Sequence, residues 1–257
     1  MNDCKTRYPI VLVHGLNARL GSLGGFGRIP DDLRAHGAAV FVTEQDAVGT
    51  VEGNARQLAV AFEQILVQTG AEKLNVIAHS KGGIETRCAT AALGWGDRIA
   101  SLSMLSTPNR GLYTVSRMAH TPFFDVLSLP VDLWWRIRGD DRPDFAAAVR
   151  GLTAGSMDVF NAQHPDDPRV CYQSWGAIRG SAKKDPLMSV FGLVFDRHDE
   201  ETDGMVSPAS AAWGDYRGTL TGVSHQALCD LYRCDTAGFD VRAFYRGLVK
   251  ELAEKGF

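Results

Sequence analysis

The 257-residue chain lacks the excess of positive charge that nucleic-acid binding requires. Its 27 Lys and Arg residues are outnumbered by 30 Asp and Glu residues, which gives a formal net charge of −3. Proteins that neutralise nucleic-acid phosphates carry a basic patch or a strongly basic composition. The charge balance therefore predicts no nucleic-acid partner.

Short motifs that hold metals or nucleotide phosphates are also missing. The sequence contains no HExxH, no paired CxxC and no EF-hand loop. Its glycine-rich segment has neither the GK[ST] ending of a phosphate loop nor GxGxxG spacing, so we interpret it as a wall of a substrate cleft. That segment includes Gly21, Gly24, Gly25 and Gly27. We predict that the protein uses no metal and no cofactor.

Cysteine is scarce, and the chain has no visible leader. The five cysteines are odd in number and form no motif, which favours reduced thiols, with a Cys229–Cys234 disulfide as the alternative. They are Cys4, Cys88, Cys171, Cys229 and Cys234. No basic-then-apolar stretch precedes the first apolar run, so we predict a cytoplasmic protein. A secreted mature form that has lost its leader is the alternative.

Apolar runs alternate along the chain with segments of helical character. Five runs are expected to be strands: residues 9–13, 39–42, 74–78, 99–105 and 170–175. Three segments between them are expected to be helices: residues 31–36, 51–66 and 81–93. This alternation predicts a mostly parallel central sheet flanked by helices, with right-handed crossovers. We expect a single α/β domain over residues 1–257.

The alternation stops between Pro108 and residue 163. Apolar residues crowd positions 123–137, but Asp125, Pro130 and Asp132 interrupt them, so we do not expect a membrane span. The segment is also too uniformly apolar for a free surface helix. Two interpretations stay open: core helices that cover the sheet, or a helical lid at residues 111–163 that contacts lipid when open.

One serine stands between the third predicted strand and the helix that follows it. The run Val-Ile-Ala-His-Ser-Lys-Gly-Gly at residues 76–83 places Ser80 among small residues. This pattern is typical of a sharp strand–turn–helix elbow that presents a nucleophilic hydroxyl at the edge of a sheet. Ser80 is therefore the predicted nucleophile. The alternative is a serine that only caps the helix.

A nucleophilic serine needs a base, and the base needs an acid that orients it. Among seven histidines, His225 lies in a late loop that suits a base, and it fits the chain order of serine, acid and histidine. His14 is expected to hold its own loop, and His79 to point away from Ser80. The other histidines lie in segments that suit a base less well.

The acid is expected in the loop that precedes His225. We favour Asp203, because Gly204 permits a tight turn and the apolar pair after it can anchor the loop; Asp196 is the second candidate. Two backbone N–H groups should hold the oxyanion. We assign them to Leu16, in the loop after the first strand, and to Lys81, directly after the nucleophile.

Together these motifs resemble those of bacterial lipases of the α/β-hydrolase superfamily, close to the true lipases of family I. The matching segments are residues 8–16, 78–83, 106–111, 160–161, 172–175, 203–206 and 224–225. The resemblance implies an α/β-hydrolase fold with a lid, and triad roles for Ser80, Asp203 and His225. It also implies a serine carboxylic-ester hydrolase, in first place a lipase that cleaves triacylglycerol-type esters. Its partners would be an ester or lipid substrate and, transiently, a lipid interface met through the lid.

Other functions and two departures from the family stay open. A short-chain carboxylesterase, an acyltransferase with the same triad and a non-catalytic lipid-binding protein are the alternatives. Many related lipases bind calcium through an aspartate two residues after the catalytic histidine, but this chain has Ala227 there, with Asp230 nearby. Lys81 also replaces a residue that is often uncharged, and we expect its ammonium to reach water along the helix.

Overall fold

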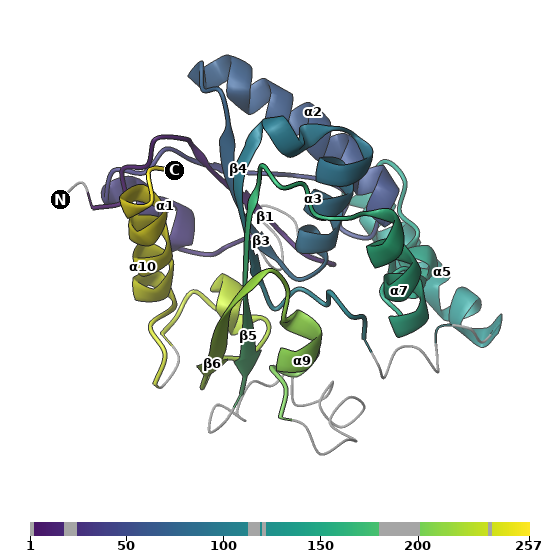
Figure 1. The fold of residues 1–257 in the computed structure, drawn as a ribbon. Coiled ribbons are helices and arrows are strands. Elements are labelled where there is room, and N and C mark those ends of the chain that lie inside the picture. The colour runs from purple at the N-terminus through teal and green to yellow at the C-terminus, as the bar shows by residue number, and fades with distance from the viewer. Residues whose placement is uncertain (1–2, 18–24, 113–118, 120–121, 180–200, 236–237) are drawn as a thin grey trace.

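The computed structural model describes residues 3–17, 25–112, 119, 122–179, 201–235 and 238–257. Its strands are β1 (Ile10–Val13), β2 (Val40–Val42), β3 (Leu74–His79), β4 (Ile99–Leu105), β5 (Cys171–Ile178) and β6 (Asp215–Thr221). They form one parallel sheet in the order β2-β1-β3-β4-β5-β6 (Figure 1). The predicted parallel sheet is confirmed, and β6 is additional to the five predicted strands.

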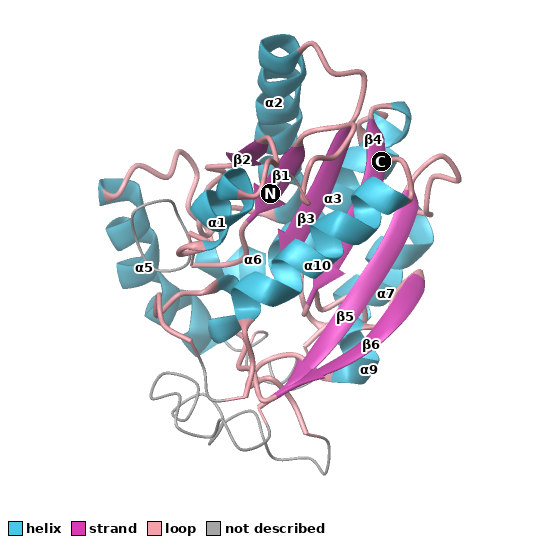
Figure 2. Ribbon diagram, turned by 90° about the vertical axis from the view of Figure 1, so that its left-hand side faces the viewer, coloured by secondary structure: helices cyan, strands magenta, loops and turns pink. Residues whose placement is uncertain are grey.

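Helices cover both faces of the sheet. On one face lie α1 (Ile29–Ala35) and α10 (Val241–Glu254), and on the other lie α2 (Val51–Thr69) and α3 (Lys81–Ala92) (Figure 1). Figure 2 shows α10 in front of the strands. Successive strand residues point to opposite faces, so Val11 and Val13 of β1 pack with α2 and α3, whereas Ile10 and Leu12 pack with α1 and α10.

The segment between β4 and β5 contains helices in place of the strand–helix alternation. These helices are α5 (Pro122–Ile137), α6 (Phe145–Arg150) and α7 (Ala154–Gln163). Short elements elsewhere are η1 (Trp95–Asp97), α9 (Pro208–Ala211) and η2 (Ala227–Cys229). Within the described ranges, no helix has the length and apolar character needed to cross a membrane.

Helix α5 has one packed face and one exposed apolar face. The sequence suggested a segment too apolar for a free surface helix, and α5 does pack against the protein on one side. Four apolar residues spaced along its outer side are nevertheless mostly exposed: Val126 (62%), Leu129 (63%), Leu133 (61%) and Ile137 (73%). The opposite face is buried and includes Trp135. Pro130 lies inside the helix, which continues through it.

The direction of strand addition reverses beside β1. From β1 the chain crosses through α1 to β2 at the edge, then returns through α2 to β3 on the other side of β1. In open parallel sheets a crevice forms at the carboxyl ends of the strands at such a point. The loop that begins at His14 and the turn at Ser80 follow the two strands that meet there.

Helix α3 packs directly against the end of β1. A methyl group on Gly82 would lie 2.5 Å from the carbonyl oxygen of His14 and 2.8 Å from that of Val13. These are backbone atoms, which cannot move aside as the end of a flexible side chain can. The absence of a side chain at Gly82 therefore sets how closely α3 approaches β1.

We expect Gly82→Ala to lower the free energy of unfolding by about 1–3 kcal/mol, the usual cost of overpacking. Gly247→Ala in α10 is the control, because an added methyl group there meets nothing within 4 Å. Alanine in that helix interior should raise stability by up to about 1 kcal/mol. Urea denaturation of both variants measures the difference, and unchanged stability of Gly82→Ala would contradict the close packing.

Candidate active site

Ser80 occupies a strained turn between β3 and α3. Its φ of 54° and ψ of −130° lie outside the regions that non-glycine residues favour. The Ser80 N–H donates to the carbonyl oxygen of Leu105 at 2.9 Å, and the Ser80 carbonyl oxygen accepts from the N–H of Gly83 at 3.1 Å. The side chain makes no capping hydrogen bond to α3, which argues against a serine that only caps the helix.

The loop after β1 passes directly beside Ser80. A methyl group on Gly15 would lie 2.7 Å from Cβ and 3.2 Å from Oγ of Ser80. Glycine leaves this space open, so the backbone of the loop can approach the hydroxyl. Nδ1 of His14 lies 3.0 Å from the Gly15 carbonyl oxygen, which confirms that His14 helps to hold this loop. Leu16 comes next, and Lys81 follows Ser80 on the other side.

Asp203 and His225 form a buried pair. Nδ1 of His225 lies 2.7 Å from Oδ2 of Asp203, and the His225 N–H donates to the Asp203 carbonyl oxygen at 2.9 Å. The other carboxylate oxygen, Oδ1, accepts from the N–H groups of Met205 at 2.9 Å and Val206 at 2.8 Å. The carboxylate is thus fixed by three donors from its own loop and from His225.

These donors keep Asp203 ionised inside the protein. Burial alone would raise its pKa, but the charge and hydrogen bond of His225 and the N–H groups of Val206 and Met205 together hold the pKa of Asp203 below its ordinary value. An ionised carboxylate can only accept, so His225 donates through Nδ1. Its Nε2 then carries a lone pair that can take up a proton.

His79 connects this pair to the serine turn. It is the last residue of β3, directly before Ser80, and its ring centroid lies 4.5 Å from that of His225. The sequence suggested only that His79 points away from the nucleophile, so its contact with His225 is a finding of the structure. Because of this contact, the His225 loop and the Ser80 turn are neighbours although they are distant in the sequence.

The predicted site residues therefore gather in two adjoining groups. Asp203 and His225 are in direct contact, Leu16 follows β1, and Ser80 and Lys81 follow β3. His79, directly before Ser80, joins the two groups through its contact with His225. The roles of these residues stay predictions. Several residues weighed in the sequence lie outside the described residues. They are Asp196, the second candidate for the acid; His120 and His198, two of the histidines that suit a base less well; and Gly21 and Gly24 of the glycine-rich segment.

Comparison with known proteins establishes the family. Residues 8–151 match the family described as the alpha/beta hydrolase fold, which is more than half of the chain. The chain belongs to the α/β-hydrolase family. The hydrolase is 32% identical to a triacylglycerol lipase of Pseudomonas fragi, with 83% of this chain and 84% of that one covered. It is 30% identical to a triacylglycerol lipase of Vibrio cholerae, with 83% and 78% covered.

A solved structure supports the same fold. The Staphylococcus hyicus lipase matches the hydrolase with a TM-score of 0.78 at 14% identity, over 97% of this chain and 96% of that one. The expected resemblance to lipases is thus confirmed, and so is the expectation of a carboxylic-ester hydrolase.

Lys81 contradicts the expectation that its ammonium reaches water. Its side chain is fully buried and forms an ion pair with Glu85, one turn further along α3. Glu85 is buried as well, and it accepts from Asn54 and Gln45. The charge stays inside because a carboxylate neutralises it there. The i,i+4 spacing of Lys81 and Glu85 was the signal available in the sequence.

The residues after His225 do not fit a calcium site. Ala227 has no side-chain oxygen, and both carboxylate oxygens of Asp230 are occupied by Arg28. Oδ2 of Asp230 accepts from the Arg28 N–H at 2.6 Å and from Nε at 2.9 Å, and Oδ1 accepts from Nη2 at 2.8 Å. In the part of the chain that the structure describes, no three His, Cys, Asp or Glu side chains form a potential metal cluster.

All five cysteines lie in described segments of the hydrolase, and all are free thiols. Cys229 is buried and Cys234 is exposed, so the alternative disulfide between them is not formed in this structure. Burial raises the pKa of the Cys229 thiol to about 12, which keeps it protonated at neutral pH.

Helix α5 rests on the loop after β1. Trp135 is buried with Ala47 and Val48, and Leu16 packs against the same cluster. Nε1 of Trp135 also donates to Oδ1 of Asn17 at 3.0 Å. The buried face of α5 is therefore attached next to the predicted oxyanion loop, while its apolar outer face is exposed.

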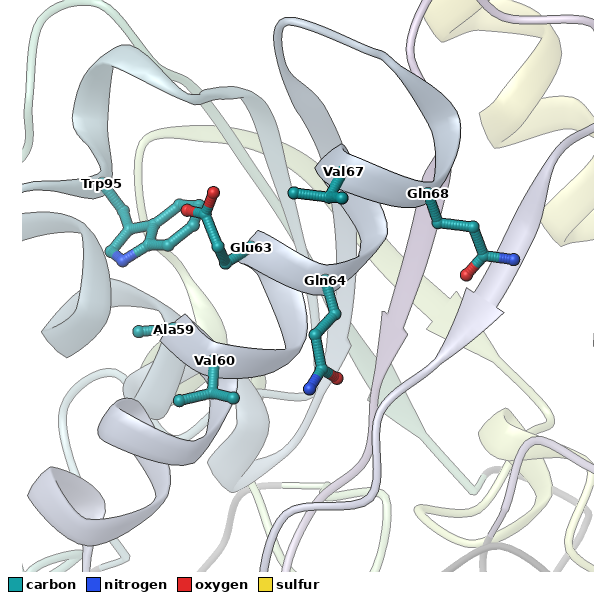
Figure 3. A pocket seen from close by; sticks show the side chains of 7 residues that line it. All are labelled: Ala59, Val60, Glu63, Gln64, Val67, Gln68 and Trp95. Carbon is teal, nitrogen blue, oxygen red and sulfur yellow. The ribbon is translucent and has the colours of Figure 1, made fainter.

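A separate groove lies on α2 (Figure 3). It is lined by Ala59, Val60, Glu63, Gln64, Val67, Gln68 and Trp95. None of the five predicted site residues lines it. Val60 and Val67 of this groove are exposed apolar residues on another element, so they serve as a comparison for the exposed apolar residues of α5.

Protonation of buried histidines should make the stability of the hydrolase depend on pH. Burial and the neighbouring His225 lower the pKa of His79 well below 6.5, and burial lowers that of His14. The unfolded chain therefore binds more protons below pH 6.5, so stability is full above that pH and is lost as the pH falls.

We expect the free energy of unfolding to fall between about pH 7 and pH 5.5, with at most about 1.4 kcal/mol per pH unit from each buried histidine. His79→Gln should reduce this slope, because glutamine does not titrate. Urea denaturation at both pH values measures it. A variant that loses stability as steeply as the wild type would contradict the assignment to His79.

Proposed function

We propose that Ser80 is the nucleophile of a serine ester hydrolase. Ser80 Oγ attacks the ester carbonyl carbon while Nε2 of His225 takes its proton and then passes it to the leaving alcohol. Asp203 orients His225 and stabilises the imidazolium. Water then attacks the acyl-enzyme with His225 again as base, which releases the carboxylic acid and restores Ser80. The observation that carries the proposal is the 2.7 Å contact of His225 and Asp203 beside the strained Ser80 turn.

Two backbone N–H groups stabilise the oxyanion in this mechanism. Lys81 is the first residue of α3, where N–H groups have no acceptor within the helix. Leu16 belongs to the loop whose backbone passes Ser80 at Gly15. Removing one such donor from a serine hydrolase costs about 2.7–4 kcal/mol of transition-state stabilisation. Both donors lie on the main chain, so side-chain substitution at Leu16 would test them poorly.

Ser80→Ala should lower kcat on a soluble p-nitrophenyl ester by at least about 10⁴-fold, because the nucleophile is lost. Asp203→Asn should lower it by about 10⁴-fold, because an amide favours the wrong tautomer of His225. Both variants should stay folded, as circular dichroism can check. Ser106→Ala is the matched control, because Ser106 also has a positive φ (47°) after a strand but is fully buried. Near-normal turnover of Ser80→Ala would rule out Ser80 as the nucleophile.

We further propose that the substrates are lipid esters of the triacylglycerol type, and that residues 111–163 form a lid that meets the lipid. Two relatives are named triacylglycerol lipases. The exposed apolar face of α5 supports contact with a lipid surface, since an uncovered face of this kind marks an interaction site. The packing of Leu16 against the buried Trp135 of α5 supports such contact close to the proposed oxyanion hole.

Transfer of the exposed apolar face of α5 from water to lipid would contribute enough free energy to determine binding to a lipid surface. Moving one Leu or Ile side chain from water into lipid gains about 1.5–3 kcal/mol. Two such residues together contribute about 3–6 kcal/mol, and every 1.4 kcal/mol or so changes affinity tenfold. Polar substitution of two α5 residues should therefore weaken binding to an interface by more than tenfold.

We expect Leu133→Gln/Ile137→Gln to lower hydrolysis of a tributyrin emulsion at least about tenfold, with less than about a twofold effect on a soluble short ester. The control is Val60→Gln/Val67→Gln on α2, whose residues are 59% and 76% exposed. This control should leave both rates unchanged. Equal rates for the α5 variant and the wild type on the emulsion would contradict the lid proposal and favour a short-chain carboxylesterase.

A further inference from the structure

A buried polar network lies behind the Ser80 turn, and the mechanism above does not use its side chains. Lys81 and Glu85 form an ion pair at the start of α3, with 0% and 1% of each residue exposed. Asn54 of α2 donates to Oε1 of Glu85 at 2.7 Å, and Gln45 donates to Oε2 at 3.2 Å. We call Lys81, Glu85, Asn54 and Gln45 the Glu85 network.

Gln45 extends the network to the loop after β1. Its Nε2 also donates to the carbonyl oxygen of His14 at 3.0 Å. The Thr43 hydroxyl donates to Oε1 of Gln45 at 2.7 Å, so the orientation of the amide is set by its partners. His14 directly precedes Gly15 and Leu16. The network therefore holds the loop two residues before one of the proposed oxyanion donors.

We infer that Glu85 is a positioning residue for the oxyanion hole and acts on both donors. It holds the side chain of Lys81, whose N–H is one donor, and through Gln45 it holds the loop that carries Leu16. The inference rests on the proposed function, in which these two N–H groups bind the oxyanion. Preorganised donors stabilise a transition state only when they are held at the right distance, so small displacements are costly.

A gain in protein stability does not by itself explain why Lys81 and Glu85 are charged residues at buried positions. Replacing a buried ion pair with apolar side chains of similar volume is often neutral or stabilising, because desolvation offsets the attraction. The two carboxylate oxygens of Glu85 accept hydrogen bonds from Lys81, Asn54 and Gln45, which lie on three separate segments. An apolar side chain at this position could accept none of these hydrogen bonds. The carboxylate thereby fixes these segments relative to one another.

Gln45→Met separates positioning from the ion pair. It removes Nε2 at similar side-chain length and leaves Lys81 and Glu85 in place. We expect kcat on a soluble p-nitrophenyl ester to fall about 10- to 100-fold, less than for complete loss of a donor, with KM changed less than about threefold. An alkylboronic acid forms a tetrahedral serine adduct, so its affinity should fall by the same factor as kcat/KM.

Thr43→Val provides a second variant should Gln45→Met fail to fold. It keeps the shape of the side chain but removes the hydroxyl that orients Gln45, and kcat should fall about 3- to 10-fold. Lys81→Met/Glu85→Leu removes both charges together. This double variant leaves one N–H each of Asn54 and Gln45 without an acceptor, so its thermal midpoint should fall, and kcat should fall as well because Gln45 loses its carboxylate partner.

Asn75→Leu is the matched control for loss of buried hydrogen bonds. Asn75 is fully buried near the opposite end of β3 from Ser80, where it donates to Tyr8 and accepts from Ser101. This variant should lower the thermal midpoint without changing kcat or boronic-acid affinity.

The outcomes distinguish the inference from the proposed function. Unchanged kcat and boronic-acid affinity in Gln45→Met and Thr43→Val would overturn the inference, and so would an equal loss of kcat in Asn75→Leu. In either case turnover would still depend on Ser80, so the proposed function would stand. Full turnover by Ser80→Ala would instead show that the proposed function itself is wrong.

Discussion

The backbone of Gly15 passes Ser80 so closely that a methyl group on Gly15 would lie 2.7 Å from the Ser80 Cβ. Gly82 is crowded in the same way against the carbonyl oxygen of His14. These two missing side chains let the end of β1 and the start of α3 meet where strand addition reverses. The close approach of these two segments brings Ser80 near both proposed oxyanion donors, Leu16 and Lys81. The proposed base, His225, comes from a loop that is distant in the sequence.

Two buried carboxylates support the parts that meet there. Asp230, five residues after His225, accepts three hydrogen bonds from Arg28 at the start of α1 and so ties the loop after His225 to the helical layer. Glu85 supports the other side, behind Ser80. Asp230 takes its three hydrogen bonds from one distant residue, Arg28, whereas Glu85 takes its hydrogen bonds from three segments. The site is therefore fixed by the protein's own charges, each of which is neutralised inside the fold.

Local patterns predicted the sheet and the elbow, whereas features that depend on distant partners escaped prediction. Continuous apolar runs identified the first five strands, but β6 alternates half-buried and exposed residues and includes Asp215 and Arg217, so it offered no such run. Helix α10 could have been found, since Val241, Tyr245 and Leu248 recur at helical spacing. The ion pair of Lys81 with Glu85 had a signal in their i,i+4 spacing, but its burial had none, because it depends on Asn54 and Gln45, which come from other segments to bond Glu85. The contact between His79 and His225 likewise depends on the folded chain.

The most direct test of the central claim is to locate the covalent adduct of a p-nitrophenyl alkylphosphonate by peptide mass spectrometry. Trypsin cleaves after Lys73 and Lys81, which releases residues 74–81 with Ser80 as their only serine. The account predicts one phosphonate per inactivated chain, carried by Ser80. A phosphonate on Ser80 can block tryptic cleavage after Lys81, so a longer peptide that carries the phosphonate on Ser80 supports the account equally well. Inactivation with the phosphonate on another residue, or with Ser80 unmodified, would contradict the account.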